Sequence, residues 1–329
     1  MESMEWLRLA GSLALVTAGA EALVRGATVL ALRAGVSSMF VGLTVVGFGT
    51  SSPELGASLA ATAKGATDVG VGNVVGSNIF NVAAILGVTA LIRPVHVKLA
   101  LIRRDVAVAL VAACVPWAAI PFEGTIGRFG GVVLLACLVA FVVLAYRAAR
   151  RAGRESEALV RHELETTLGG GLLTREPVRL ALHGGLVVLG LILLAAGSRS
   201  FVDAALVLGR SHGVSELVLG LTVVAAGTSL PELFTSVVAT LRGNTDLAVG
   251  NILGSNIFNI FGILGTCAVV APQHVDDWVM RMDAPVMLAA TLALLPLLWR
   301  DGRITRVEGA LLLAGYGAYL AALLARGGA

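Results

Sequence analysis

Two glutamates that lie beside prolines inside long apolar stretches are the residues of this chain best suited to chemistry. Glu54 belongs to the heptapeptide 49–55, and Glu232 belongs to its second copy at 227–233, so the copies are separated by 178 residues. An unpaired charge in such an apolar stretch is costly, and it marks a functional site by default. We therefore expect the two copies to meet and to form one cation site.

Short polar residues accompany each glutamate. Pro53 and Pro231 each remove a backbone donor, so the helices should break near Thr50 and Thr228 and leave carbonyl groups free. In the next apolar stretch a serine and an asparagine are spaced four residues apart, on one helical face. The candidate ligands are Thr50, Ser51, Glu54, Ser77 and Asn81 in the first half, and Thr228, Ser229, Glu232, Ser255 and Asn259 in the second.

The candidate ligands are all oxygen donors, with no histidine or cysteine among them. Carboxylates, carbonyls, hydroxyls and amides suit hard cations such as Ca²⁺ and Na⁺. Two ionised glutamates would be neutralised by one Ca²⁺, by two Na⁺ or by two protons. Competition between ions for the same carboxylates is what an exchange of cations requires.

The composition restricts the class of protein that can hold such a site. Of 329 residues, 57% are hydrophobic and only 14% are charged, and the mean hydropathy is +0.89. These values indicate a polytopic membrane protein rather than a soluble one. The formal net charge of +3 is explained by arginine-rich loops, so no nucleic-acid partner is expected.

Ten apolar runs have the length that a bilayer requires. They cover residues 5–32, 36–63, 69–92, 100–121, 126–149, 178–209, 214–241, 246–271, 282–299 and 306–325. The charged and glycine-rich stretch 151–177 separates the fifth run from the sixth. We interpret this stretch as a short, partly helical linker that is too small to be a folded regulatory domain.

The two halves of the chain are copies of each other. Without any gap, 24 of the 41 residues at 47–87 are identical to those at 225–265. The domains are therefore a first five-helix repeat at 1–150, the linker at 151–177, and a second repeat at 178–329. Because five is an odd number, the second repeat must enter the membrane from the opposite side, which is the inverted-repeat plan of many secondary transporters. The predicted fold is all-α, with ten transmembrane helices.

The distribution of lysine and arginine predicts the orientation. With the N-terminus outside, the inner loops carry 16 of these residues and the outer loops carry 6. Because inner loops are enriched in positive charge, we expect both termini outside and the linker in the cytoplasm. We expect the protein to lie in the cell membrane, which is the inner or plasma membrane. It should cross this membrane several times and contact its lipids.

The duplicated heptapeptides, each followed by Gly-Ser-Asn-Ile-Phe-Asn at 76–81 or 254–259, resemble the α-repeats of the Ca²⁺/cation antiporter superfamily. That superfamily includes sodium/calcium exchangers, and the resemblance covers nearly the whole chain. It implies ten helices, alternating access, and a central site made by spans 2, 3, 7 and 8. It also implies that Glu54 and Glu232 bind Ca²⁺ with the carbonyls of Thr50 and Thr228, while the serines and Asn81 and Asn259 complete the Na⁺ positions.

One difference from the superfamily bears on the counter-ion. Many sodium-coupled members carry an acid at one of the positions matched by Asn81 and Asn259, and here both are asparagine. The site therefore has one fewer possible negative charge, which favours electroneutral exchange. Ca²⁺/H⁺ exchange stays open, because the two glutamates could themselves take up protons.

Charged residues outside the central set have more ordinary explanations. Glu21 with Arg25, and Arg199 with Asp203, occupy matching positions with opposite signs, and each pair is spaced for an intrahelical ion pair. Asp68 and Asp246 follow threonine at the start of spans 3 and 8, where helix capping is the default role. A place on the ion path is the alternative for the four residues of these pairs, and attraction of ions at the mouth is the alternative for Asp68 and Asp246.

The sequence thus predicts a secondary antiporter that exchanges Ca²⁺ for Na⁺, with Ca²⁺/H⁺ exchange as the alternative. A cation channel would also use rings of oxygens, but paired broken helices suit alternating access better. No nucleophile–base pair indicates an enzyme. We expect no cofactor beyond the transported ions and no obligate protein partner.

Overall fold

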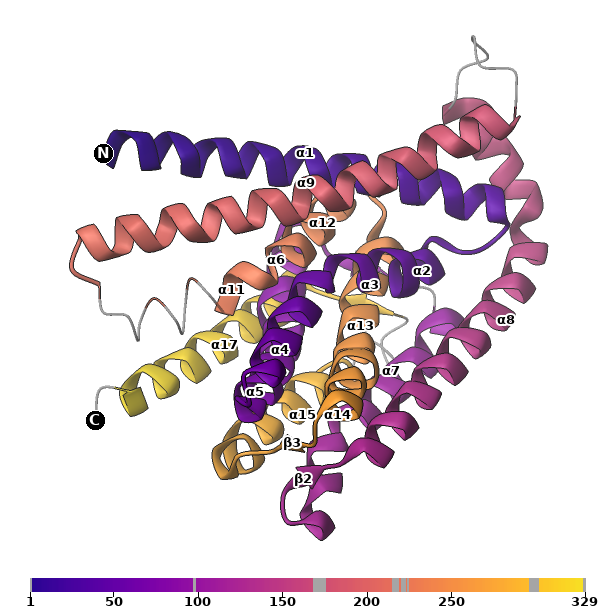
Figure 1. Cartoon of the computed structure of the whole chain (residues 1–329). Helices are drawn as coiled ribbons and strands as arrows, with labels where there is room; N and C mark the ends of the chain where they lie inside the picture. Colours follow the sequence, from indigo (N-terminus) through magenta and orange to yellow (C-terminus); the bar gives the residue numbers. More distant parts are fainter. Residues whose placement is uncertain are drawn as a thin grey trace.

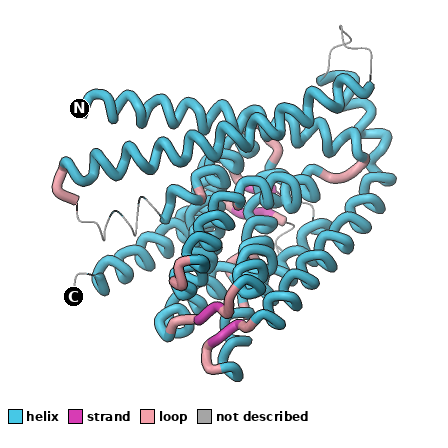
Figure 2. The backbone as a smooth tube through the Cα atoms, in the orientation of Figure 1, coloured by secondary structure: helices cyan, strands magenta, loops and turns pink. Residues whose placement is uncertain are grey.

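The computed structural model describes residues 2–96, 99–167, 176–214, 219, 223, 225–295 and 302–327, and helices make up most of them (Figures 1 and 2). The first half contains α1 (Glu2–Ala34), α2 (Ser38–Val41), η1 (Gly42–Val46), α3 (Gly47–Thr50), α4 (Ser52–Ala63), α5 (Thr67–Ile79), η2 (Phe80–Ile85), α6 (Leu86–Ile92), β1 (Val95–His96), α7 (Leu99–Ala113), η3 (Val115–Phe122), β2 (Thr125–Ile126) and α8 (Arg128–Thr167).

The second half repeats this succession. It contains α9 (Glu176–Ser211), α11 (Ala225–Thr228), α12 (Leu230–Leu241), α13 (Thr245–Phe258), η5 (Asn259–Leu264), α14 (Gly265–Val270), β3 (Gln273–His274), η6 (Val279–Asp283), α15 (Ala284–Leu292), β4 (Arg303–Ile304) and α17 (Arg306–Gly327). The segment α3–α4–α5–η2–α6 therefore has its counterpart in α11–α12–α13–η5–α14, as the internal repeat predicts.

Within the described ranges, seven continuous helical stretches are long and apolar enough to cross a membrane. The other three predicted spans, 36–63, 214–241 and 282–299, fall on helices that are broken into shorter pieces or that lie partly outside the described residues. The all-α membrane architecture is confirmed, and the number of ten spans stays a prediction.

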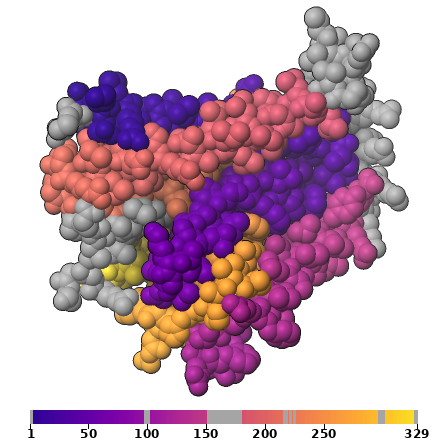
Figure 3. Space-filling model, in the orientation of Figure 1, coloured from indigo at the N-terminus to yellow at the C-terminus, as the bar shows by residue number. Residues whose placement is uncertain are grey.

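The long helices α1 and α9 lie side by side and antiparallel (Figure 1). A Cβ atom added at Gly19 would lie 2.8 Å from the Leu194 nitrogen, and one added at Gly190 would lie 2.6 Å from the Leu23 nitrogen. Glycine thus allows the two backbones to touch along the contact. Because α1 and α9 are equivalent elements of the two repeats, their opposite directions agree with an inverted repeat. In the space-filling view α9 covers part of the first half (Figure 3).

Glycine also sets the packing of α13 in the centre of the molecule. A Cβ atom at Gly254 would lie 2.3 Å from the Leu43 carbonyl oxygen, and one at Gly250 would lie 2.5 Å from that of Met39. These contacts seat α13 directly on the backbone of α2 and η1. A Cβ atom added at the equivalent glycines of α5, Gly72 and Gly76, would meet no described atom within 4 Å, and residues 217 and 221, which match Met39 and Leu43, lie outside the described residues.

Two short antiparallel ribbons tie the halves together at their loops. In one ribbon β1 pairs with β4, with Val95 opposite Ile304, and in the other β2 pairs with β3, with Thr125 opposite His274. Each ribbon therefore takes one strand from each repeat. Its backbone hydrogen bonds fix the loops of one half against those of the other.

The predicted linker is helical over its first part. The backbone of α8 continues from the fifth apolar run as far as Thr167, and α9 begins at Glu176. The partly helical linker that the sequence predicts is thus an extension of α8, and residues 168–175 lie outside the described residues.

Candidate cation site

Both proline-containing helices are interrupted at the predicted point. In the first half α3 ends at Thr50 and α4 begins at Ser52, and in the second α11 ends at Thr228 and α12 begins at Leu230. Proline occupies the first turn of α4 and of α12, where its missing backbone donor costs nothing. Each glutamate therefore lies in the first turn of a helix, where the helix dipole favours a negative charge.

The two glutamates are buried and are held by serines of the opposite repeat. Ser51 Oγ donates to Glu232 Oε1 at 2.8 Å, and Ser229 Oγ donates to Glu54 Oε1 at 2.8 Å. Glu54 is 1% exposed and Glu232 is fully buried. The two hydrogen bonds are related by the repeat, and they bring the broken helices of both halves to one place.

Four asparagines form a second cluster between α5 and α13. Asn78 Nδ2 donates to the Asn256 carbonyl oxygen at 3.2 Å, and Asn256 Nδ2 donates to that of Asn78 at the same distance. Asn81 Nδ2 donates to Asn256 Oδ1, and Asn259 Nδ2 donates to Asn78 Oδ1, both at 3.0 Å. Asn78 and Asn256 thus make interhelical bonds that orient the amides of Asn81 and Asn259.

Four buried oxygens of these side chains have no hydrogen-bond partner. They are Glu54 Oε2, Glu232 Oε2, Asn81 Oδ1 and Asn259 Oδ1. Buried polar atoms are almost always paired, so a set of unpaired buried acceptors needs an explanation. Carboxylate and amide oxygens of this kind are common ligands of hard cations.

The remaining predicted ligands differ in their burial and in their hydrogen bonds. Thr50 Oγ1 donates to Asn251 Oδ1 at 3.1 Å, and Ser255 Oγ donates to the Gly47 carbonyl oxygen at 3.2 Å. Ser77 is buried, while Thr228 is half-buried. The hydroxyls of Thr50 and Ser255 are already used inside the protein, so any oxygen that these two residues offer a cation comes from remaining lone pairs or from the backbone.

Two asparagines that the sequence analysis missed donate hydrogen bonds to the backbone carbonyl oxygens of the two glutamates. Asn251 Nδ2 donates to the Glu232 carbonyl oxygen at 3.3 Å and to Ser236 Oγ at 2.9 Å. In the first half Asn73 Nδ2 donates to the Glu54 carbonyl oxygen at 3.5 Å and to Ser58 Oγ at 3.0 Å. All four asparagine and serine positions are identical between the repeats, and this duplication was the signal that could have identified them.

Of the two predicted intrahelical ion pairs, only one is present. Arg25 pairs with Glu21, and the same carboxylate also binds Arg242 at the end of α12. The predicted Arg199–Asp203 pair is wrong, because Asp203 Oδ2 instead accepts from Arg8 Nη2 of α1 at 3.0 Å. The antiparallel packing of α1 on α9 brings this competing arginine to the aspartate.

The predicted capping role of Asp68 and Asp246 is also wrong. Asp246 lies in the first turn of α13, and the cap is Asn244, whose Oδ1 accepts from the Leu247 nitrogen at 3.1 Å. Asp68 lies in the first turn of α5 after Ala66, which occupies the cap position without a side-chain bond. Both aspartates can still interact favourably with the helix dipole from these positions.

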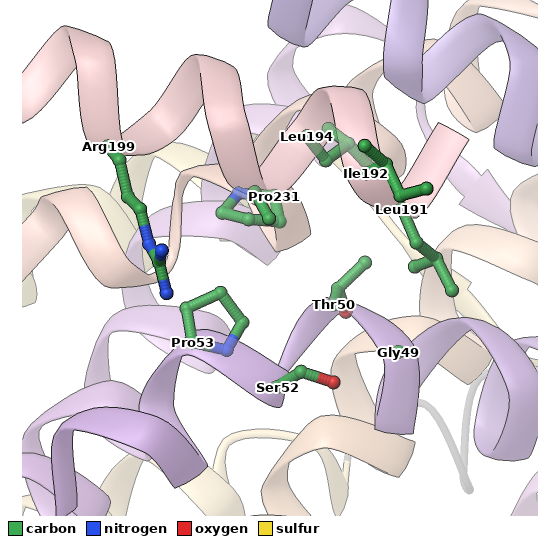
Figure 4. Close-up of a pocket in the computed structure, with 10 residues that line it drawn as sticks. Gly49, Thr50, Ser52, Pro53, Leu191, Ile192, Leu194, Arg199 and Pro231 are labelled. Carbon is green, nitrogen blue, oxygen red and sulfur yellow. The ribbon is translucent and has the colours of Figure 1, made fainter. Parts of the chain in front are cut away.

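A partly open pocket of about 250 Å³ lies beside the first break. Its walls are Thr50, Pro53 and Pro231 on the side of the broken helices, and α9 from Leu191 to Arg199 on the other (Figure 4). The Arg199 side chain reaches from α9 toward Pro53. Pro53 and Pro231 each precede a glutamate of the site by one residue, so the pocket lies next to the helix breaks that carry Glu54 and Glu232.

The donor chemistry of the site is restricted to oxygen. In the part of the chain that the structure describes, no cluster of three or more histidine, cysteine, aspartate or glutamate residues could hold a metal ion. The two carboxylates are instead supplemented by neutral amide and hydroxyl oxygens. Such a donor set suits weakly held hard cations better than a permanently bound transition metal.

A comparison with protein families identifies the kind of molecule that carries this site. The model of the family described as sodium/calcium exchanger protein matches residues 4–147 and again residues 182–325. The two matches are displaced by 178 residues at both ends, so each repeat is one copy of the family unit. The chain belongs to the sodium/calcium exchanger family.

Full-length relatives of this exchanger-family chain are similar along almost all of its length. The inner membrane protein YrbG of Escherichia coli is 38% identical over 314 residues, which cover 94% of each chain. The sodium/calcium exchanger MaX1 of Methanosarcina acetivorans is 31% identical and covers 98% of this chain and 99% of its own length. A solved structure of the sodium-calcium exchanger NCX_Mj, soaked without Na⁺ and Ca²⁺, is 28% identical with a TM-score of 0.81, covering 98% of this chain and all of that one.

Proposed function

We propose that this exchanger-family protein is a secondary antiporter that moves Ca²⁺ across the cell membrane in exchange for Na⁺. The four unpaired buried oxygens of Glu54, Glu232, Asn81 and Asn259 carry this proposal. Two of these oxygens come from each repeat, so a cation would be bound between the two halves. A site shared by inverted halves can be exposed to either side when one half moves against the other.

The two carboxylates are the Ca²⁺ ligands in this proposal. Glu54 and Glu232 each keep one oxygen free, while the other is fixed by a serine hydroxyl of the opposite repeat. The carbonyls of Thr50 and Thr228, at the ends of α3 and α11, are the proposed backbone ligands. Ser51, Ser77, Ser229, Ser255, Asn81 and Asn259 complete the Na⁺ positions or line the site.

The proposed stoichiometry is one Ca²⁺ for two Na⁺. Asn81 and Asn259 are neutral, so the two glutamates are the only acidic members of the proposed ligand set. A charge of −2 is balanced equally by one divalent or by two monovalent cations. The ion-free site is costly because its carboxylates are buried, and this cost discourages the protein from crossing unloaded.

Protons are the alternative counter-ion, and the same two carboxylates support it. Each glutamate has a free oxygen that could carry a proton when Ca²⁺ leaves. A cation channel is the rival from another class, and the buried, internally bonded glutamates argue against a continuous pore. Uphill Ca²⁺ transport driven by a counter-ion gradient would exclude a channel.

Ca²⁺ uptake into proteoliposomes made from the purified protein tests the proposal. We expect an outward Na⁺ gradient to drive Ca²⁺ accumulation, and Glu54→Gln or Glu232→Gln to reduce it to the level of empty liposomes. Glu123→Gln is the matched control, because Glu123 is exposed in a loop. Retained uptake in either site variant would refute the assignment, and uptake driven only by a pH gradient would favour protons. The assay contains only ions and lipid, so it also tests whether a cofactor or a protein partner is needed.

The orientation is proposed from charge, with both termini outside and the linker at 151–177 in the cytoplasm. Relatives such as the inner membrane protein YrbG support the membrane location. Single cysteines placed near each terminus in intact cells should react with a membrane-impermeant maleimide. Reaction of a cysteine in the linker before the cells are opened would contradict this orientation.

A further inference from the structure

Arg199 is the one charged side chain that lines the pocket beside the candidate cation site. Its guanidinium points from α9 toward the break between α3 and α4 (Figure 4). The aspartate that its spacing offers, Asp203, is bound by Arg8 instead. Among the described residues no hydrogen bond or ion pair is recorded for Arg199, which is exposed, and its positive charge faces the pocket.

The matching position in the first repeat carries the opposite charge and a different set of contacts. Glu21 lies 178 residues before Arg199, and its carboxylate is bound by Arg25 and Arg242. Glu21 is not part of the pocket wall. The two repeats therefore differ at this position, whereas the glutamates and serines of the site are the same in both repeats.

We propose that Arg199 is a specificity-determining residue that lowers the affinity of the site for divalent cations on the side to which this pocket opens. This inference rests on the proposed cation exchange. The repulsion between a fixed positive charge and an entering ion is proportional to the charge of the ion. The affinity for a divalent ion is therefore lowered by the square of the factor that lowers the affinity for a monovalent ion.

The position of Arg199 gives this effect a direction. Arg199 lies in the C-terminal half of α9, which begins at Glu176 next to the proposed cytoplasmic linker. In the proposed orientation the end of the pocket that carries Arg199 therefore faces the outside. A weaker Ca²⁺ affinity on that side promotes Ca²⁺ release outside while Na⁺ still binds, which is the direction that extrusion requires.

Apparent affinities measured from the pocket side test the proposal. We expect Arg199→Met, which removes the charge but keeps a long side chain, to raise the apparent affinity for external Ca²⁺ by about 10-fold and for external Na⁺ by about 3-fold. Arg199→Lys keeps the charge and should behave like the wild type. Arg281→Gln is the matched control, because it removes an exposed arginine from the proposed outer surface, away from the pocket.

Ionic strength supplies a second readout. Because exposed charges are screened by salt, the difference between Arg199→Met and wild type should shrink when choline chloride is raised to about 0.5 M. Unchanged affinities in Arg199→Met, or equal changes for Ca²⁺ and Na⁺, would overturn the proposal while leaving the exchange itself intact. Absence of any exchange in the wild type would instead refute the proposed function.

Discussion

Two neutral amides limit the charge that the site can offer. Asn81 and Asn259 each use their nitrogen in a hydrogen bond to an asparagine of the other repeat and keep their oxygen free. At either position a carboxylate would add a negative charge and would remove the amide donor of this hydrogen bond. The choice between amide and carboxylate therefore determines how many positive charges balance the site.

We predict that the wild-type exchange is electroneutral and that Asn81→Asp makes it electrogenic. The added charge should be balanced by a third Na⁺, so each cycle would move one net charge. The initial rate of Na⁺-driven Ca²⁺ uptake, measured with and without a K⁺ diffusion potential set by valinomycin, checks this. A potential-sensitive wild type would contradict the proposed stoichiometry.

Asn251 supports Glu232 through a chain of bonds that a hydrophobic residue cannot replace. It donates to the Glu232 carbonyl oxygen and to Ser236, and it accepts from Thr50. Each buried group left without a partner costs about 1–3 kcal/mol. We predict that Asn251→Leu destabilises the protein by about 2–5 kcal/mol, measured by thermal unfolding in detergent.

Asn73→Leu is the matched variant in the first repeat. Asn73 is half-buried and has equivalent bonds to Ser58 and Glu54, the latter at 3.5 Å. Because its surroundings are less buried, its replacement should cost less stability than that of Asn251. Equal losses in the two variants would show that burial does not set the cost.

At the scale of elements, glycine lets α13 pack directly on the first repeat. A Cβ atom at Gly250 would lie 2.5 Å from the Met39 carbonyl oxygen, and one at Gly254 would lie 2.3 Å from that of Leu43. The backbones of α2 and η1 therefore hold α13 at both glycines. The segment that matches η1 in the second half lies mostly outside the described residues.

A glycine substitution tests this close packing. Gly254→Ala would place a Cβ atom 2.3 Å from the Leu43 carbonyl oxygen, which must move to make room. We predict that the free energy of unfolding falls by about 1–3 kcal/mol, as is typical of overpacking, while Gly11→Ala on the exposed face of α1 should cause no loss. Thermal unfolding of both variants is the measurement, and an unchanged stability in Gly254→Ala would contradict the prediction.

The sequence predicts the elements that depend on local chemistry and leaves open those that depend on distant partners. Proline places both helix breaks, and the duplicated residues identify the two glutamates that meet. The partner of Asp203 was mispredicted, because spacing along one helix says nothing about Arg8, which approaches from α1. Asn251 was missed for the same reason, since two of its partners lie elsewhere in the chain.

At the scale of the whole molecule, the halves are joined by reciprocal contacts. The Ser–Glu bonds, the asparagine cluster and both strand ribbons each draw on the two repeats equally. These contacts do not need the chain to be continuous between the repeats. We infer that the linker keeps the two halves close during assembly and is not needed to form the site.

We therefore predict that the two halves, expressed as separate chains divided after Thr167, assemble when they are produced together. Na⁺-driven Ca²⁺ uptake should return in vesicles that contain both chains, and neither half alone should give uptake. Copurification of an untagged second half with a tagged first half is the physical measurement. Failure of copurification would mean that the linker contributes to the fold.

The reciprocal pairing of Asn78 with Asn256 also bears on how such a chain arose. Each residue donates to the backbone of its own counterpart, so the contact is isologous, like the two-fold interface of a homodimer. A single five-span gene product inserted in both orientations could have built the same contacts between two copies of itself. Gene duplication and fusion would then have freed the copies to diverge, and the opposite charges of Glu21 and Arg199 record that divergence.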